Sequence, residues 1–382
     1  MRLNNLRLTG AEGLHDIWVD AGKFLAIRPS GTGSGEVSLD FGGALAFPGL
    51  INSHDHLDFN LFPALGNKIY NNYTEWGRDI HTNNSADIQK ILKVPQQLRT
   101  QWGVYRNLLN GFTTVVNHGE QLDIDRPPIT VFQDCHCLHS VHFERHWKWK
   151  LNDPRRTGRP FAIHVGEGTD AVAKEEVDEL IRWNLLRRPI VGIHGVAMTE
   201  QQAAAFHALV WCPVSNYFLL DRTAPVDRLS PVLPILFGTD STLTGGWNAW
   251  DQVRFARDLR LIGDAGLMET LTTAPADAWG LHDRGRIEPG CSADLVIARI
   301  RPGLAAWEAF FAINSDDLLL VLHEGQIRLF DPLLLEPITE QGLTADDFQP
   351  ACANGKYVAG DLPALMKEIG SYCPDILFPP LP

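Results

Sequence analysis

The chain has 382 residues, of which 45% are hydrophobic and 21% are charged. This composition is ordinary for a soluble globular protein and excludes disordered and fibrous classes. The formal net charge is −13, which argues against nucleic acid or an anionic membrane as a partner, because both attract basic patches.

The cysteines and the N-terminal residues indicate the cellular compartment in which the protein is found. Six cysteines are spread too thinly for a disulfide scaffold, and reduced thiols fit them better. Residues 1–22 lack the apolar segment of a signal peptide, and no apolar run approaches the ~18 residues of a membrane helix. We therefore expect a cytoplasmic protein. Our expected partner is a small-molecule substrate, and a homodimer is left open.

Residues 1–45 predict the first part of a small β-sandwich. Apolar and polar residues alternate along residues 14–30, and a second strand-like segment follows the sequence GTGSG at residues 31–35. GTGSG lacks the Lys-Ser/Thr ending of a phosphate-binding loop, so we interpret it as a hairpin turn.

Residues 46–282 have a different sequence pattern. Short apolar runs alternate with amphipathic, helix-like stretches such as residues 86–110 and 171–186. Buried strands that alternate with helices indicate βα units and a parallel sheet. Seven or eight such units predict an α/β protein with a TIM-like (β/α)8 barrel. Only 46 residues separate His118 from His164, so we expect the third or fourth strand to be short, distorted or without its helix.

The pattern returns to β-structure after residue 282. Residues 283–331 read as strand, turn and strand, and we interpret them as the second part of the small β-sandwich. Residues 332–382 form a Pro-rich C-terminal extension, which we expect to pack on the barrel or at an oligomer contact.

Polar side chains recur where the apolar runs end. His54 and His56 are two residues apart, so on a strand both imidazoles share one face. In a (β/α)8 barrel the C-terminal strand ends meet at the active site. The later runs end in His164 with Glu167, in His194 and in Asp240. Histidine and carboxylate ligands suit zinc or iron, whereas burying such a cluster without a metal would be costly.

Five motifs carry a resemblance to a known family. They are, in chain order, FPGLINSHDH, IHVGEG, GIHG, CPVSN and FGTDS, and the later segment DRGRIEPGCSADLVIARI accompanies them. Together they resemble the amidohydrolase superfamily, in particular its cytosine/guanine-deaminase and triazine-hydrolase-like branch, over roughly residues 1–330.

The resemblance implies a role for each matching residue. One divalent ion, Zn²⁺ with Fe²⁺ as the alternative, would be held by His54, His56, His164 and Asp240. Asp240 would also take a proton from the metal-bound water, and Glu167 would carry protons to the substrate nitrogen and the leaving group. His194 would orient the water or polarise the attacked carbon, with a role as a ligand left open. Three further residues are candidate substrate contacts: Asn216, Trp76 and His118.

A second metal is not favoured by the sequence. Binuclear relatives use a carboxylated lysine, and the nearby candidates are Lys148 and Lys150. Lys150 lies only 14 residues before His164, which leaves too little chain for the required crossover. Cys135, His136 and Cys137 do not match the spacing of a closed zinc site. His139 and His142 remain candidates to line the pocket.

The chemistry predicts a hydrolase in which metal-activated water attacks an sp² carbon. Deamination of an amino-substituted heterocycle is our first hypothesis, because a free carboxylic acid such as Glu167 can protonate ring nitrogens. The alternatives are a hydrolase that opens a cyclic amide or imidazolone, and a metal-binding protein without turnover. A serine hydrolase is disfavoured because no G-x-S-x-G motif is present. The identity of the substrate stays open.

Overall fold

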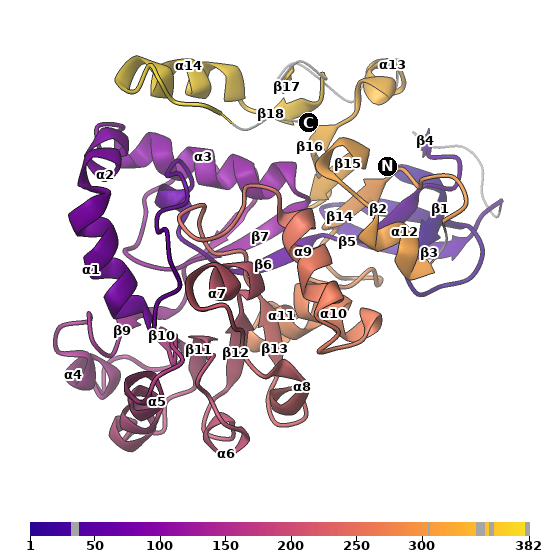
Figure 1. Cartoon of the computed structure of the whole chain (residues 1–382). Helices are drawn as coiled ribbons and strands as arrows, with labels where there is room; N and C mark the ends of the chain where they lie inside the picture. The colour runs from indigo at the N-terminus through magenta and orange to yellow at the C-terminus, as the bar shows by residue number, and fades with distance from the viewer. Residues whose placement is uncertain (32–37, 305, 341–347, 351–354, 379–382) are drawn as a thin grey trace.

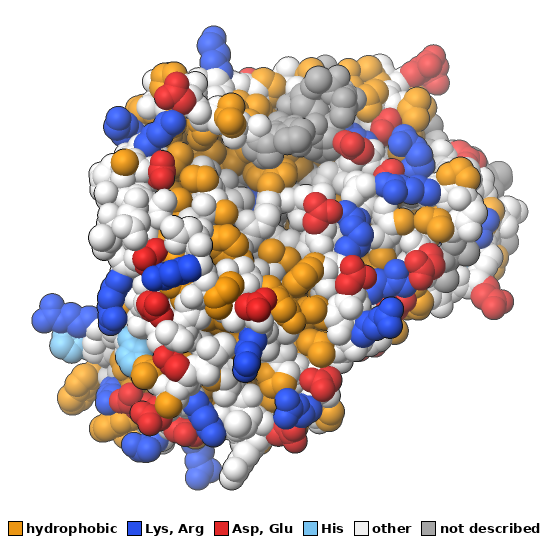
Figure 2. All heavy atoms as spheres, viewed as in Figure 1, with side chains coloured by type: hydrophobic (Ala, Val, Ile, Leu, Met, Phe, Trp, Pro, Cys, Tyr) orange, Lys and Arg blue, Asp and Glu red, His pale blue; other side chains and the backbone are white. Residues whose placement is uncertain are grey.

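The computed structural model describes residues 1–31, 38–304, 306–340, 348–350 and 355–378. It has a mixed α/β fold with parallel sheets, as the sequence predicted. The hairpin turn expected at residues 31–35 lies almost wholly outside the described residues. No described helix is long and apolar enough to cross a membrane. Figure 2 shows acidic and basic side chains interspersed over the visible face.

Eight parallel strands form the central part of the molecule (Figure 1). One sheet contains β6 (Leu50–Asp55), β7 (Phe112–Asn117) and β8 (Thr130–Phe132), in that order. The second sheet has the order β13-β12-β11-β10-β9, formed by β9 (His136–Ser140), β10 (Phe161–Val165), β11 (Ile190–His194), β12 (Ala208–Trp211) and β13 (Ile235–Phe237). Strands β6, β7, β10, β11 and β12 are buried along their whole length, as is usual for parallel strands that are covered on both faces.

The helices of this central part lie around the strands (Figure 1). They are α1 (Tyr73–Asn83), α2 (Ser85–Ile91), α3 (Gln96–Leu109), α4 (Trp147–Leu151), α5 (Ala171–Trp183), α6 (Glu200–Ala203), α7 (Pro213–Leu220), α8 (Val226–Leu229), α9 (Ala249–Asp258), α10 (Asp264–Leu271) and α11 (Thr273–Ala278). Capping residues in the local sequence determine where several of these helices begin. Asp170 caps α5 by accepting the N–H of Ala173, and Thr199 with Gln202 forms a capping box on α6.

The irregularity expected between His118 and His164 is present. Strand β8 has three residues, and β9 follows after residues 133–135 without an intervening helix. Only the five-residue helix α4 separates β9 from β10. The three connections from β7 to β8, β8 to β9 and β9 to β10 therefore contain one short helix between them, and the region loses helices rather than a strand.

The ends of the two parallel sheets approach each other at β13 and β6. The N–H of Asp240 donates to the carbonyl of His54 over 3.0 Å, and the N–H of Thr239 donates to the side chain of Asn52 over 3.0 Å. Among the described residues, however, no strand ladder joins β13 to β6 or β8 to β9. Strand pairing alone therefore does not close the predicted barrel.

Strands from both ends of the chain form one further sheet of ten strands. The N-terminal members are β1 (Arg2–Leu8), β2 (His15–Asp20), β3 (Lys23–Pro29), β4 (Ser38–Asp40) and β5 (Leu45–Pro48). The C-terminal members are β14 (Leu295–Ala298), β15 (Leu318–His323), β16 (Gln326–Phe330), β17 (Phe348–Pro350) and β18 (Tyr357–Ala359). Strand β5 joins the two groups, because it pairs with β1 on one side and with β14 on the other.

The remaining helices are α12 (Ala306–Phe311), α13 (Leu335–Glu340) and α14 (Leu362–Tyr372), with short 3-10 turns at Leu57–Phe59, Ser315–Asp317 and Pro332–Leu334. Helix α14 lies along α3 (Figure 1). Tyr105 of α3 donates to the carbonyl of Ala359 over 3.0 Å, and the rings of Trp102 and Phe378 are 4.9 Å apart. The C-terminal extension therefore packs on the central part of the molecule.

Candidate active site

The predicted metal ligands meet at one point. His54 is the last but one residue of β6, His56 follows β6 directly, and His164 lies near the end of β10. The ligand atoms of His54, His56 and Asp240 lie within 4.8 Å of one another, and so do those of His54, His164 and His194. Because His54 belongs to both groups, all five side chains surround a single centre.

The spacing of these atoms fits a tetrahedral ion. Nε2 of His54 is 3.3 Å from Nε2 of His164 and 3.7 Å from Oδ1 of Asp240, and Nε2 of His56 is 4.0 Å from the same oxygen. Zinc–nitrogen bonds of about 2.05 Å place tetrahedral ligand atoms about 3.3 Å apart. Three imidazoles and one carboxylate are also ligands that zinc takes. The residues present therefore fit a divalent metal ion.

The hydrogen bonding of His164 prepares it for metal binding. Its Nδ1 lies 2.7 Å from the carbonyl oxygen of His139. A carbonyl can only accept, so Nδ1 of His164 donates and the lone pair of Nε2 faces the centre. Such a bond to the second ring nitrogen is typical of metal-binding histidines.

Burial keeps the histidines of the centre neutral. It lowers the pKa of His54 and of His164 well below the ordinary value, and neighbouring imidazoles lower both further. The pKa of His56 is lowered too, again mainly by burial. Neutral imidazole is the form that binds a metal ion.

The two carboxylates of the site have opposite properties. Burial alone would raise the pKa of Asp240, but electrostatic interaction with the nearby imidazoles of His56 and His194 and hydrogen bonds from Ser215 (2.8 Å) and the N–H of Ser241 (2.7 Å) lower it overall. Burial raises the pKa of Glu167 well above the ordinary value, and the neighbouring carboxylates add to the rise. The surroundings thus favour the charged form of Asp240 and the protonated form of Glu167, a division that acid–base enzymes use.

A chain of hydrogen bonds determines which nitrogen of His194 carries a proton. Trp211 Nε1 donates to Thr223 Oγ1 over 2.6 Å, Thr223 donates to Asn216 Oδ1 over 3.2 Å, and Asn216 Nδ2 lies 2.9 Å from His194 Nδ1. An indole N–H can only donate, and in this arrangement His194 Nδ1 accepts. Neutral His194 then carries its proton on Nε2, which lies 3.6 Å from Oε1 of Glu167. This arrangement favours His194 as a hydrogen-bond donor over His194 as a metal ligand.

The backbone at two of these residues is left-handed. His194 has φ 72° and Asp240 has φ 54°, a region that few residues other than glycine adopt. Both follow or end a strand, and a backbone hydrogen bond holds each turn, from Gly195 to the carbonyl of Val165 and from Asp240 to that of His54. Such conformations persist where the surroundings enforce them, commonly at functional sites.

Sequence reasoning missed a buried group that supports the loop of Asp240. Arg106 of α3 donates to the carbonyls of Asp240 (2.8 Å) and Gly246 (2.7 Å) and to Oδ1 of Asn60 (2.6 Å), and it pairs with Asp55 over 3.2 Å. Burial raises the pKa of Asp55 to about 6, although Arg106 and hydrogen bonds lower it in part. The available signal was an arginine among apolar residues at the end of a helical segment.

A cavity of about 740 Å³ opens above the centre and is largely apolar. His56, His164, Glu167, His194 and Asp240 line its floor. Its walls include Phe59, Phe62, Leu65, Trp76, Ile80, Phe143, Leu219 and Leu243, and Arg78 and His81 also contribute to the lining.

The residues that the sequence suggested as substrate contacts or pocket lining lie in different parts of the structure. Trp76 and His139 line the cavity, and the indole N–H of Trp76 is bound to the carbonyl of Leu65 over 2.7 Å. His118 lies beside His164, with ring centroids 4.4 Å apart, outside the cavity lining. His142 is also outside that lining, and Asn216 lies behind His194. The structure therefore gives Asn216 contact with His194 rather than with a substrate in this cavity.

The candidates for a second metal lie apart from the centre. Lys148 pairs with Glu179 over 2.6 Å, and Lys150 pairs with Glu144. The sulfurs of Cys135 and Cys137 are 3.6 Å apart. Within the described residues, the groups able to hold a metal ion contain only the histidines and the aspartate of the single centre.

Fold and site together define a parallel α/β enzyme built around a His/Asp metal centre. No family model matches the chain. A curated relative, the 5-methylthioadenosine/S-adenosylhomocysteine deaminase of Haloarcula marismortui, is 25% identical over 82% of this chain and 87% of its own length. The solved adenosine deaminase of Xanthomonas campestris with bound zinc has a TM-score of 0.70 and 16% identity, and it covers 98% of both chains.

The atrazine chlorohydrolase of Arthrobacter aurescens, solved with zinc, has a TM-score of 0.71 and 17% identity over 98% of this chain and all of its own. These findings confirm the predicted resemblance to deaminases and triazine hydrolases of the amidohydrolase superfamily. They also confirm the predicted enzyme class, a metal-dependent hydrolase of the amidohydrolase/deaminase kind that acts on carbon–nitrogen bonds other than peptide bonds.

Proposed function

We propose that this protein uses one zinc ion, held by His54, His56, His164 and Asp240, to deaminate an amino-substituted heterocycle. The observation that carries the proposal is the convergence of three imidazole nitrogens and a carboxylate on the floor of a cavity that Glu167 and His194 also line. A divalent ion held by these residues would lower the pKa of its water to about 7. The deaminase names of the curated relatives support the same reaction.

The chain's own residues then divide the proton transfers. Asp240, which is charged near neutral pH, accepts a proton from the attacking water. Glu167, whose raised pKa favours its protonated form, delivers a proton to the ring nitrogen, and the departing amine takes the proton that Asp240 accepted from the water. The new hydroxyl returns a proton to Glu167 as the carbonyl forms. His194 donates a hydrogen bond from Nε2 and fixes the position of the water or of the attacked carbon.

The volume and the apolar lining of the cavity favour a substrate with an apolar substituent. Its volume of about 740 Å³ falls within the range that binds drug-sized ligands. Aromatic and aliphatic side chains such as Phe62, Phe143 and Leu243 supply most of its walls. We therefore propose a heteroaromatic ring whose amino group lies at the metal centre and whose apolar substituent lies against these side chains.

The proposal also includes the closure of the barrel, the bounds of the domains and the cellular compartment. The eight parallel strands, with β13 beside β6, support one (β/α)8 barrel over residues 46–282. Residues 1–45 and 283–331 would be one small β-domain, and residues 332–382 an extension. The five described cysteines are free thiols, which fits the cytoplasm.

Ammonia release from a panel of amino-heterocycles, with and without apolar substituents, tests the proposal. Glu167→Gln should lower kcat by about 10²–10⁴-fold with unchanged zinc content. Glu175→Gln, the same change on the exposed face of α5, should leave kcat unchanged. A new carboxylate without ammonia would indicate the ring-opening reaction, and full activity of the Glu167 variant would contradict the mechanism.

A further inference from the structure

Hydrogen bonds to the main chain on both sides fix the position of Glu167. Its own carbonyl accepts the N–H of Tyr73 over 3.1 Å, and the N–H of Gly166, the preceding residue, donates to Oε2 of Glu176 over 3.0 Å. Tyr73 begins α1 and Glu176 belongs to α5. Given the proton-transfer role proposed for Glu167, on which this inference rests, we propose that Tyr73 and Glu176 are positioning residues, which hold the backbone of Glu167 so that its carboxyl group reaches the reacting atoms.

The two positioning residues also contact each other. The hydroxyl of Tyr73 donates to Oε1 of Glu176 over 2.7 Å. Three hydrogen bonds therefore form a closed ring, which passes through the backbone of Gly166 and Glu167. Tyr73 is 4% exposed and Glu176 is 2% exposed, so water does not compete for these bonds. Hydrogen bonds to a charged carboxylate are also among the strong ones.

The chain turns at Gly166, between the ligand His164 and the acid Glu167. Gly166 has φ 63°, a conformation that glycine adopts at little cost. Its carbonyl accepts the N–H of Ala197 over 2.9 Å, so both polar groups of its backbone are bound. Removal of the acceptor on Glu176 leaves the N–H of Gly166 without that partner, and the turn that carries Glu167 is then free to relax.

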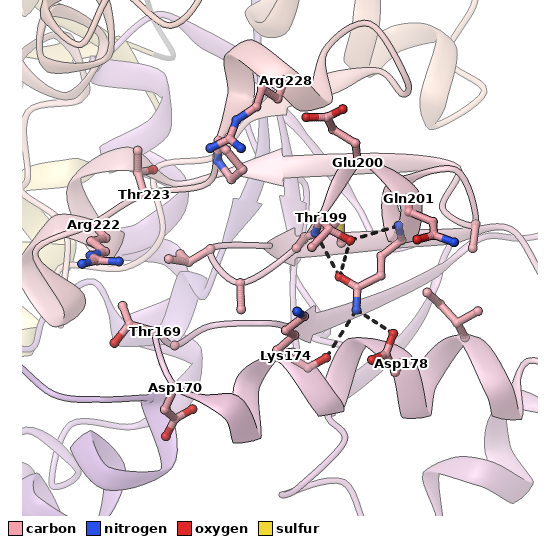
Figure 3. Close-up of a pocket in the computed structure, with 18 residues that line it drawn as sticks. Thr169, Asp170, Lys174, Asp178, Thr199, Glu200, Gln201, Arg222, Thr223 and Arg228 are labelled. Carbon is pink, nitrogen blue, oxygen red and sulfur yellow. Dashed lines mark hydrogen bonds between the residues drawn. The ribbon is translucent and has the colours of Figure 1, made fainter.

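A carboxylate is costly at the buried position of Glu176. Figure 3 shows Lys174 and Asp178 of α5 beside a groove between α5, α6 and α8, and Glu176, two residues from each, lies on the opposite, buried face of the helix. Burial raises the pKa of Glu176 to about 7, although the hydrogen bonds that it accepts lower it in part. Within the described residues, no nitrogen of a basic side chain lies within 4.0 Å of its carboxylate. Burying such a group without a cation costs stability, so its place directly behind Glu167 favours a role in the reaction.

Tyr73 also connects this ring of hydrogen bonds to the substrate cavity. It lines the cavity next to Phe143, and the two aromatic rings meet edge to face with centroids 5.3 Å apart. A substituent that lies against this wall therefore contacts a residue bound directly to the main chain of Glu167. Enzymes use such contacts, away from the reacting atoms, to orient the groups that react.

Substitutions in two backgrounds separate positioning from a general structural effect. In the zinc-loaded enzyme, Tyr73→Phe and Glu176→Leu should each lower kcat by about 10–100-fold with KM and zinc content unchanged, and Glu176→Gln, which keeps one oxygen acceptor, should recover part of the loss. In a Glu167→Gln enzyme none of them should lower kcat further, because residues that act through one group are not additive. The exposed substitutions Tyr372→Phe and Glu175→Gln should leave kcat unchanged in both backgrounds. Full kcat in the first background, or equal losses in both, would overturn the proposal.

Amide hydrogen exchange tests the ring without any turnover. In Tyr73→Phe and in Glu176→Leu, the N–H of Gly166 should exchange at least about tenfold faster than in the wild type. The N–H of Ile163, inside β10, should exchange as before and serves as the control. Unchanged exchange at Gly166 in both variants would overturn the positioning role. Faster exchange together with full activity of Glu167→Gln would instead refute the proposed reaction and leave the ring in place.

Discussion

Replacing Arg106 by methionine should destabilise the protein in a way that depends on pH. The substitution removes the hydrogen bonds to Asn60 and to the carbonyls of Asp240 and Gly246, and it leaves Asp55 buried without its cation. Breaking one side of a buried ion pair costs about 3–5 kcal/mol. The loop that holds Asp240 also loses its anchor, so zinc affinity should fall as well.

The pH dependence follows from Asp55. Its pKa is raised from 3.8 to about 6 in the folded protein, so the fold binds this proton more tightly than the unfolded chain does. The difference corresponds to about 3 kcal/mol of stability that is present at low pH and lost as pH rises through about 6. Without Arg106 the folded pKa rises further, so the loss at high pH grows.

Urea unfolding of the metal-free protein measures the effect. At about pH 8 we expect Arg106→Met to lose the full 3–5 kcal/mol, and at about pH 5, where Asp55 is protonated, only the hydrogen-bond part of about 1–2 kcal/mol. Arg182→Met, on the exposed end of α5, is the matched control and should lose almost nothing. Equal losses at both pH values would refute the reasoning.

Three further predictions concern the site itself. His54→Ala should abolish zinc binding, measured by elemental analysis, because His54 belongs to both ligand groups; retained stoichiometric zinc would contradict the assigned ligands. Asn216→Leu should lower kcat by about 10–100-fold with zinc content unchanged, and a loss of zinc instead would make His194 a ligand. Phe143→Ala should raise KM about tenfold for substrates with an apolar substituent and not for the unsubstituted ring, and equal effects on both would place the substituent elsewhere.

The sequence was most informative about side chains at strand ends. His54, His164, His194 and Asp240 lie far apart in the chain, but parallel strands bring their carboxyl ends to one edge, so their meeting followed from the pattern alone. The spacing of His118 and His164 likewise located the irregular strands β8 and β9.

Features that depend on tertiary contacts could not be predicted in this way. Asp55 lies between two candidate ligands, and strand alternation places it on the opposite face, but only the fold shows that Arg106 meets it there. The role of Asn216 depends on Trp211 and Thr223, whose spacing matches no motif. Strands such as β17 and β18 have three residues each, too few for a periodic signal to appear.

The position of β5 has a consequence for synthesis of the protein on the ribosome. Residues Leu45–Pro48 pair with Leu295–Ala298. One edge of β5 therefore stays unpaired until the ribosome has added the partner strand, about 250 residues further along the chain. At 5–20 residues per second this wait lasts about 12–50 s. During that time the N-terminal strands present an unpaired edge, which is a template for aggregation. We therefore expect the nascent chain to depend on chaperones until β14 has emerged, and fragments that end before residue 295 to aggregate.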